Sequence, residues 1–275
     1  MTLSDFTITF WGVRGSRPVP GPRTVIYGGN TPCVEVRIGK RLIILDAGTG
    51  ITNLGSKLMQ EPGPVIGDIF ITHVHWDHIQ GFPFFQPAFR IGNSFCLYGE
   101  RKGNVSFAAS IKRTMRHPHF PVPLEHMGAA LHFTEIEPGD MLELGDGITV
   151  RTAANNHPDG GISYRIQYGN KSCCYVTDYE HGPEKAQALL ELCAGTDLLI
   201  YDACFTAAEY PGYQGWGHST WEEGLALLEA TGAGRLILFH HKPERSDEEM
   251  AVLETNITGQ YPMVKAAREG MVISL

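Results

Sequence analysis

The sequence lacks the features of a membrane or exported protein. It contains no run of about 18 consecutive apolar residues, the length that a transmembrane helix requires. Its N-terminus, MTLSDFTITFWG, has neither a basic leader nor an apolar signal core. We therefore expect a cytoplasmic protein with no membrane partner.

Positive charge is also scarce. The chain has 22 lysines and arginines against 30 acidic residues, which gives a formal net charge of −8. Because contacts along a polyanion need a basic face, this composition disfavours long nucleic acid as the main partner. A small anion bound at a local site remains compatible with it.

Cysteine is infrequent and shows no metal-binding or redox spacing. The six cysteines contain no C-x-x-C pair, and Cys173 and Cys174 are adjacent inside an apolar run, where buried thiols are common. We expect reduced packing residues, with disulfides as the minor alternative.

The remaining composition is that of an ordinary globular chain. Its 275 residues are 43% hydrophobic and 19% charged, and no low-complexity tract, short repeat or linker divides them. We predict a single domain over residues 1–275. Its β-branched and aromatic runs predict strands over 6–13, 33–38, 41–48, 68–73, 148–154, 162–168, 172–178, 197–203, 235–240 and 271–275.

Helical patterns lie between the later strands. Apolar residues recur at helical spacing over 182–195 and 219–234. The second of these segments opens with Ser219 three positions before Glu222, which predicts a capping box, and it closes at a glycine. A further helix is expected at the start of 107–127, followed by a proline-rich loop. Strands that alternate with helices favour an α/β architecture of layered sheets covered by helices.

Metal-capable side chains collect where the predicted strands end. In layered α/β folds, ligands bind at such strand ends. Six predicted strand ends carry a metal-capable side chain, which is more than chance placement would give. The residues concerned are Asp46, His73, His157, Asp178, Asp202 and His240.

The densest cluster is THVHWDH, residues 72–78. In an extended segment alternate side chains point the same way, so His73 and His75 can reach one ion while Asp77 and His78 turn toward a second. Imidazole nitrogen and carboxylate oxygen are ligands for zinc, manganese and iron. One histidine is more often a hydrogen-bonded core or surface residue, but three histidines and an aspartate in six positions favour a metal site.

Five motifs occur in an order that resembles the metallo-β-lactamase superfamily over nearly the whole chain. They are LDAGTG (45–50), THVHWDH (72–78), NNHP (155–158), YVTDYE (175–180) and LILFHHKP (236–243). The resemblance implies a four-layer αββα sandwich with two divalent metal ions at the rim between the sheets. Zinc is the favoured ion, with manganese and iron as alternatives.

The resemblance also implies a role for each polar residue. One metal is expected to take His73, His75 and His157, the other Asp77, His78 and His240, with Asp178 bridging the two. Asp46 is expected to orient a ligand histidine, and His241 is a weaker claimant than its neighbour His240. Five neutral imidazoles with two ligand carboxylates leave such a centre net positive, which attracts an anionic substrate.

Further motifs narrow the reaction, since the superfamily hosts lactam, thioester, lactone, phosphodiester and redox chemistry. Asp178 stands where class B β-lactamases have cysteine, which disfavours β-lactam hydrolysis. Di-iron redox members usually have glutamate at the position of His75, which disfavours redox chemistry. GWGHST (215–220) resembles the extra histidine motif of tRNase Z and related phosphodiesterases, and residues 10–36 resemble their N-terminal glycine-rich hairpin. These motifs favour phosphoryl chemistry.

The implied mechanism is in-line attack on phosphorus by a metal-bridging hydroxide. His218 is expected to donate to a phosphate oxygen or to the leaving oxygen, and Asp77 to orient the nucleophile as well as bind metal. A purely structural role for His218 at a helix start is the alternative.

A small cyclic phosphodiester, such as a cyclic nucleotide, is the expected substrate because the chain lacks the glycine- and base-rich arm of tRNase Z enzymes. Arg113 and Arg116 could meet a phosphate or a partner subunit, and Phe120 could stack on a base, although solvated or packing roles are at least as common. The resemblance also implies a homodimer. A tRNase Z-like RNA-processing nuclease, an acyl or lactone hydrolase and a non-catalytic nucleotide-binding module stay open as alternatives.

Overall fold

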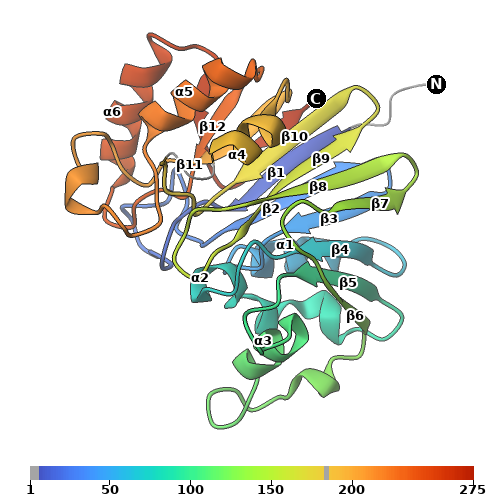
Figure 1. The fold of residues 1–275 in the computed structure, drawn as a ribbon. Coiled ribbons are helices and arrows are strands. Elements are labelled where there is room, and N and C mark those ends of the chain that lie inside the picture. The colour runs from blue at the N-terminus through green and yellow to red at the C-terminus, as the bar shows by residue number, and fades with distance from the viewer. Residues whose placement is uncertain (1–5, 183–185) are drawn as a thin grey trace.

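Two mixed seven-stranded sheets stack face to face, with helices on their outer faces (Figure 1). The computed structural model describes residues 6–182 and 186–275. The strand order is β14-β1-β2-β3-β4-β5-β6 in the first sheet and β13-β12-β11-β10-β9-β8-β7 in the second.

The first sheet is antiparallel from β14 to β3 and parallel from β3 to β6. Its strands are β1 (Phe6–Gly12), β2 (Cys33–Ile38), β3 (Arg41–Leu45), β4 (Ile66–Phe70), β5 (Ser94–Gly99), β6 (Ala130–Glu135) and β14 (Val272–Ser274).

The second sheet has a similar plan, antiparallel from β7 to β10 and parallel from β10 to β13. Its strands are β7 (Met141–Gly145), β8 (Ile148–Ala154), β9 (Ile162–Tyr168), β10 (Lys171–Val176), β11 (Leu198–Asp202), β12 (Leu236–Phe239) and β13 (Val264–Ala266).

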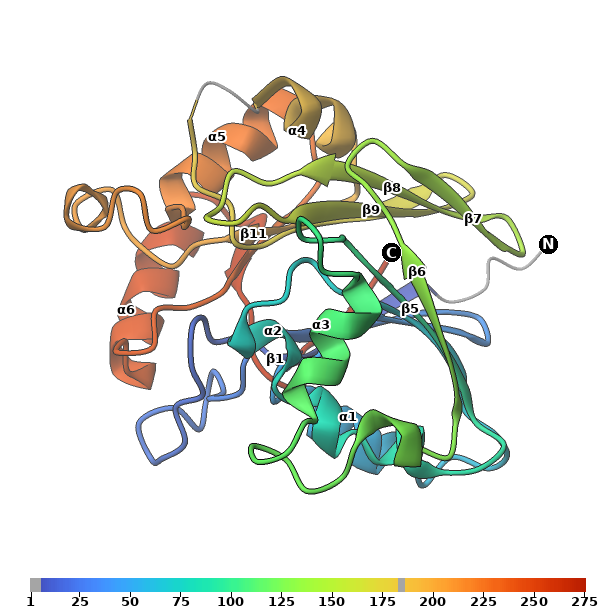
Figure 2. The ribbon, with the colours of Figure 1, turned by 60° about the horizontal axis from the view of Figure 1, so that its bottom comes forward.

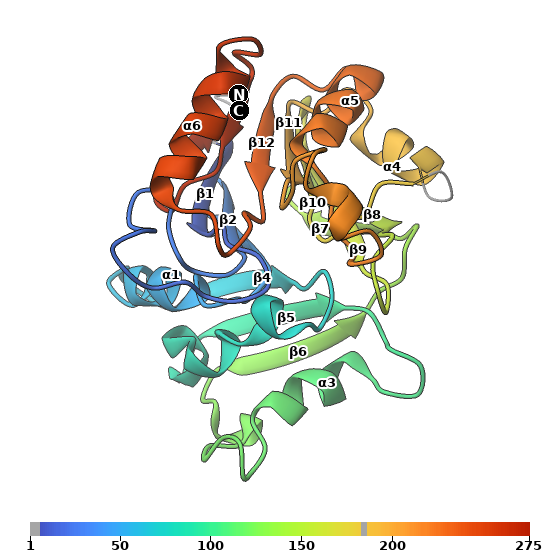
Figure 3. The ribbon, with the colours of Figure 1, turned by 90° about the vertical axis from the view of Figure 1, so that its left-hand side faces the viewer.

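The helices cover the two outer faces, so that α1 and α3 lie against the first sheet and α4 and α5 against the second (Figures 2 and 3). Among the described residues, none of the helices is long and apolar enough to span a membrane. The helices are α1 (Ile51–Leu58), α2 (Trp76–Ile79), α3 (Phe107–Thr114), α4 (Ala186–Cys193), α5 (Trp221–Thr231) and α6 (Asp247–Thr258), with short 3₁₀ turns η1 (Phe82–Phe84), η2 (Gln86–Phe89), η3 (Leu124–His126) and η5 (Tyr210–Gly212).

Three large apolar clusters hold these layers together. The largest lies between the sheets and includes Phe10, Phe70 and Tyr164, while the other two lie beneath the helices on either side. Strands such as β11 are buried along their whole length because both faces of the sheet are covered. The predicted αββα sandwich is therefore confirmed. All six cysteines are free, and five of them are buried.

The ten predicted strands are all observed, whereas strands β5, β6, β7 and β13 and helices α1 and α2 were not predicted. Strands 33–38, 148–154 and 162–168 have the predicted bounds. The helix predicted over 182–195 is observed as α4, while positions 183–185 of that prediction lie outside the described residues. Helix α6 was not predicted, although Ser246 and Glu249 form a capping box at its start.

The predicted capping box of α5 was wrong by one residue. Thr220 is the N-cap, and its side chain accepts a hydrogen bond from the backbone nitrogen of Glu223. The hydroxyl of Ser219 lies instead 2.9 Å from the hydroxyl of Tyr201 and 3.1 Å from Nδ1 of His181. Because these tertiary contacts occupy Ser219, the next residue caps the helix.

Candidate metal centre

The parallel strands of both sheets end at one edge of the sandwich, and the polar residues of the site follow them. Asp46 follows β3, Asp178 follows β10 by one residue, and His240 comes directly after β12. All three have left-handed backbone conformations, with φ of 60°, 53° and 57°. Such conformations are uncommon for residues other than glycine and concentrate at functional sites, where the surrounding structure holds the strain.

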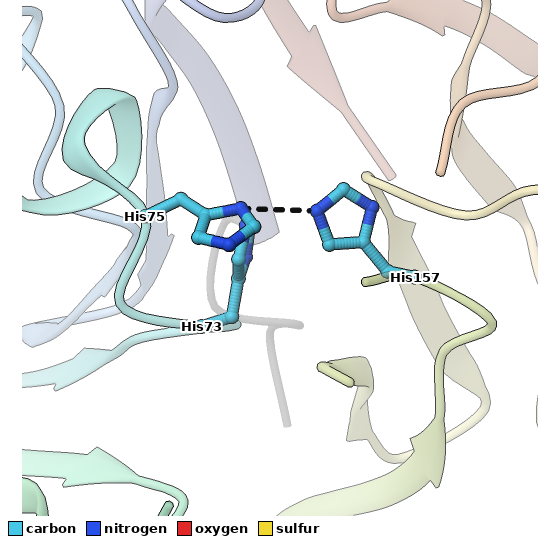
Figure 4. A group of neighbouring side chains, drawn as sticks. All are labelled: His73, His75 and His157. Carbon is cyan, nitrogen blue, oxygen red and sulfur yellow. Dashed lines mark hydrogen bonds between the residues drawn. The ribbon is translucent and has the colours of Figure 1, made fainter. Parts of the chain in front are cut away.

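Three histidines form one side of the cluster (Figure 4). His73 and His75 come from the segment after β4, and His157 comes from the loop after β8. Nε2 of His157 lies 3.1 Å from Nδ1 of His75, and one ligand atom from each of the three residues lies within 4.8 Å of the others. His73 is buried, whereas the His75 side chain is 40% exposed and forms the open side of the group.

Two histidines and two aspartates form the other side of the cluster, and all four are buried. Oδ2 of Asp178 lies 3.0 Å from Nε2 of His78 and 3.2 Å from Nε2 of His240. Oδ2 of Asp77 lies 3.3 Å from each of the same two nitrogens. The group is therefore a compact set of two imidazole nitrogens and two carboxylates.

Asp178 lies between the two groups. Its Oδ1 is 3.8 Å from Nε2 of His73 and 3.9 Å from Nε2 of His157, while its Oδ2 faces the second group. The structure thus brings together all seven residues predicted as metal ligands, with one carboxylate oriented toward both halves.

The donor atoms of this cluster fit two divalent ions. Nε2 of His73 and Nε2 of His78 are buried and form no hydrogen bond of acceptable geometry with the part of the chain that the structure describes. Buried polar atoms of this kind are costly without a partner, and imidazole and carboxylate donors at such spacing suit zinc, manganese or iron.

The carboxylates of the cluster are held in their charged form. Burial opposes ionisation, but the imidazoles of His240 and His78 hold the pKa of Asp178 well below its usual range. Burial likewise opposes ionisation of Asp77, whose pKa is lowered by His78 and by hydrogen bonding to His240. Two ionised carboxylates in a buried site favour the binding of cations.

Asp46 has the orienting position that the resemblance implied. Its carboxylate accepts hydrogen bonds from the backbone nitrogen of Thr72 at 2.8 Å and from the hydroxyl of Tyr175 at 2.9 Å. It also lies 2.8 Å from Nδ1 of His78. Because Nδ1 is bonded to Asp46, Nε2 of His78 is the nitrogen that faces Asp77 and Asp178.

The N-terminal glycine-rich segment contributes two contacts to the cluster, through Ser16 and Gly15. The backbone nitrogen of Ser16 donates to Oδ2 of Asp77 at 2.8 Å. A Cβ at Gly15 would lie 2.5 Å from the ring of His240, so only glycine fits there. In the sequence these residues belong to the GVRGS motif (12–16), but the residues that they contact, Asp77 and His240, lie 61 or more positions away along the chain.

His241 lies apart from the cluster, unlike its neighbour His240. Its Nε2 is 2.9 Å from the carbonyl oxygen of Ala267, and its ring contacts Tyr27 edge-on. Burial lowers the pKa of His241 to about 3, which keeps the ring neutral. The structure therefore directs His240 to the site and His241 into the core.

His218 lies beside the cluster and is paired with Asp202. Its Nδ1 is 2.9 Å from Oδ2 of Asp202, and its ring stacks on that of His240 with centroids 4.8 Å apart. The other oxygen of Asp202 accepts a hydrogen bond from the backbone nitrogen of Cys204 at 3.0 Å, which fixes the carboxylate. The sequence placed Asp202 at a strand end but did not identify it as the partner of His218.

This pairing favours the protonated imidazole. Burial lowers the pKa of His218, but the carboxylate of Asp202 outweighs it through charge and hydrogen bonding and raises the pKa to about 9. With Nδ1 bonded to Asp202, Nε2 is the nitrogen left to donate a proton to a bound group.

The loop that carries His218 also orients His157. The carboxylate of Glu180 accepts hydrogen bonds from the backbone nitrogens of Gly215 and Gly217 at 2.6 and 2.9 Å. The carbonyl oxygen of Gly217 lies 2.8 Å from Nδ1 of His157. This contact fixes the tautomer of His157 and presents its Nε2 to the cluster.

Gly217 offers a direct test of that contact. Its φ is +84°, and a Cβ there would lie 2.1 Å from Nδ1 of His157. We expect Gly217→Ala to weaken metal binding about 10- to 100-fold, the range for losing a group that orients a ligand. Gly215→Ala is the matched control, because Gly215 has φ +88° but no atom within 4 Å of its Cβ position. Equal losses in a metal titration of both variants would show that backbone strain alone is responsible.

Phe120 packs against other apolar side chains, while Arg113 and Arg116 are exposed. Phe120 is half-buried, contacts Phe84 edge-on at 5.4 Å and packs on the apolar cluster beneath α3. It is therefore part of the packing of the first sheet's outer layer.

Comparison with known proteins identifies the family. A sequence model described as the Beta-lactamase superfamily domain matches residues 41–241, which include all seven residues of the cluster. The chain belongs to the metallo-β-lactamase superfamily. The ribonuclease Z of Thermoplasma acidophilum is 24% identical to this superfamily member, and the match covers 89% of each chain. The ribonuclease Z of an Exiguobacterium species is 26% identical over 72% of this chain and 78% of its own.

Solved structures of the superfamily share the whole fold. The metallo-β-lactamase fold protein YhfI from Bacillus subtilis superposes with a TM-score of 0.72 at 17% identity, over 99% of this chain and all of its own. The human short-form tRNase Z gives 0.70 at 20% identity, over 98% of both chains. These solved structures show the fold, and the resemblance to the tRNase Z-like branch is carried by the sequence relatives named ribonuclease Z.

Proposed function

We propose that the protein is a dinuclear metal-dependent phosphodiesterase. The observation that carries this proposal is the His218–Asp202 pair beside the seven-residue cluster. A protonated imidazole at that position can donate to a phosphate oxygen or to a departing ester oxygen, which phosphodiester hydrolysis requires. Hydrolysis of an acyl or lactone substrate has less need of a protonated imidazole at that position.

Each residue has a proposed task. His73, His75 and His157 would hold one ion, Asp77, His78 and His240 the other, and Asp178 would bridge them. Divalent ions bound there lower the pKa of water toward about 7 and withdraw charge from phosphoryl oxygens. Asp46 and Gly217 orient ligand histidines, and Asp202 holds His218 with Nε2 facing the substrate.

The relatives support an RNA substrate at least as well as a small cyclic phosphodiester. Relatives named ribonuclease Z match this chain over most of their length. We therefore treat tRNase Z-like processing of RNA as the leading substrate class. The proposed ion is zinc, and the proposed assembly is a homodimer.

A small cyclic phosphodiester is the second candidate. It is favoured by the net charge of −8, which gives little attraction for a long polyanion. A 420 Å³ hollow beside the metal ligands also fits a compact substrate. Its lining includes His73, His75 and Lys102.

A turnover panel tests the reaction class. We expect the metal-loaded protein to hydrolyse bis(p-nitrophenyl) phosphate and to leave p-nitrophenyl acetate and a homoserine lactone unchanged. Turnover of the lactone without turnover of the diester would overturn the proposal. Adding a precursor tRNA and 2′,3′- and 3′,5′-cyclic nucleotides to the panel distinguishes the two substrate classes, since cleavage of RNA alone supports the first and cleavage of cyclic nucleotides alone the second.

A further inference from the structure

Two tryptophans, Trp76 and Trp216, are largely exposed to solvent. The side of α2 that carries Trp76 faces outward, and this residue is 66% exposed although Asp77, His78 and Ile79 after it are buried. Trp216 is 62% exposed. Large exposed indoles concentrate at binding surfaces, because one face of the ring is apolar and flat.

Both tryptophans are next in the chain to residues that belong to the cluster or contact it. Trp76 stands in the chain between His75 and Asp77. Trp216 precedes Gly217, whose carbonyl oxygen lies 2.8 Å from His157. His157 in turn lies 3.1 Å from His75. The two tryptophans therefore come from segments that follow strands of different sheets, since α2 follows β4 of the first sheet and Trp216 lies in the segment between β11 of the second sheet and α5.

Trp216 is held in place by an aromatic layer. Its ring contacts Tyr213 edge-on with centroids 5.4 Å apart, and Tyr213 stacks on Phe205 at 4.3 Å. The ammonium of Lys242 lies 4.7 Å from the centre of the Tyr213 ring. A supported, exposed ring near a cation suits a flat group attached to an anion.

We propose that Trp76 and Trp216 are specificity-determining residues that stack on the nucleobases next to the phosphate in the metal site. This inference rests on the proposed function and deepens it, because it assigns a base-bearing substrate. The phosphate would lie at the metal ligands. Trp76 is adjacent in the chain to His75 and Asp77, and Trp216 precedes Gly217, whose carbonyl oxygen contacts His157. Every base offers a π-face, so the contact gives affinity for a nucleotide with little sequence preference.

Binding of two small probes tests this without relying on turnover. The metal-loaded protein is titrated calorimetrically with adenosine 5′-monophosphate and with ribose 5-phosphate, which lacks the base. Stacking on an aromatic residue is worth about 1–3 kcal/mol per base, so we expect the nucleotide to bind roughly tenfold or more tightly than the sugar phosphate. Trp76→Ala should lower that ratio severalfold, Trp76→Phe should keep most of it, and Trp76→Ala combined with Trp216→Ala should bring it near one.

Met141→Ala is the matched control, because Met141 has the same 66% exposure but lies on the edge strand β7. It should leave the ratio unchanged. Equal binding of both probes, no measurable binding of the nucleotide, or a ratio that survives the double substitution would overturn the proposal. A change in oligomeric state on size-exclusion chromatography with an unchanged ratio would show instead that the indoles contact a second copy of the chain. Failure of the proposed function is distinct, because it would appear as absent diester turnover whatever the binding ratio.

Discussion

Replacing Asp178 with alanine is expected to reduce bound metal below two ions per subunit and to abolish diester turnover. The carboxylate faces His73 and His157 with one oxygen and His78 and His240 with the other, so its loss removes a contact to both halves of the cluster. Without it, two adjacent divalent ions would repel each other with little compensation. Metal analysis of the purified variant measures the effect.

Two asparagine variants serve as controls for this prediction. Asp178→Asn keeps the shape of the side chain and removes its charge, so it should fold and still bind fewer than two ions. Asp159→Asn changes a largely exposed carboxylate 3.8 Å from His75 and should keep both ions. An unchanged count of two ions per subunit in Asp178→Ala would contradict the proposal that Asp178 bridges them.

His218→Ala is expected to keep both ions while losing diester turnover by about two to four orders of magnitude. That range corresponds to loss of a general acid or of a donor to the developing charge on phosphate oxygen. We expect both ions to be retained because the imidazole is bonded to Asp202 and stacks on His240, while its Nδ1 is 3.9 Å from Asp178. Steady-state kinetics and metal analysis of the same preparation are both needed.

The control for His218 is its neighbour His181, whose Nδ1 lies 3.1 Å from the hydroxyl of Ser219. His181→Ala should retain near wild-type turnover. Loss of a metal ion from His218→Ala would show that His218 is a ligand, since it also lies close to Asp202 and His240 in a group that could hold an ion.

Local patterns in the sequence predicted ten of the fourteen described strands, and they brought out the cluster. The alternation and the β-branched content of strands depend on neighbouring residues, and His73, His75, Asp77 and His78 are close together in the chain itself. Asp178 and His240 were placed by the strand ends they follow, because parallel strands of a layered fold end at a common edge. The structure brings these residues together as that reasoning predicts.

Contacts between distant segments were not accessible in the same way. The hydrogen bond from Ser16 to Asp77 and the Asp202–His218 pair join residues 61 and 16 positions apart, and no periodicity encodes them. The N-cap of α5 shifted to Thr220 because Ser219 bonds to Tyr201 across the fold. The exposure of Trp76 likewise depends on how α2 packs, which its four residues do not reveal alone.

The most direct test of a dinuclear phosphodiesterase site is a metal titration of the stripped protein. Bis(p-nitrophenyl) phosphate turnover is followed while zinc, manganese or iron is added in measured equivalents. Our account predicts no turnover without metal and a rise to the maximum as binding approaches two ions per subunit. Full turnover in the stripped protein, or a maximum reached at one bound ion, would contradict it.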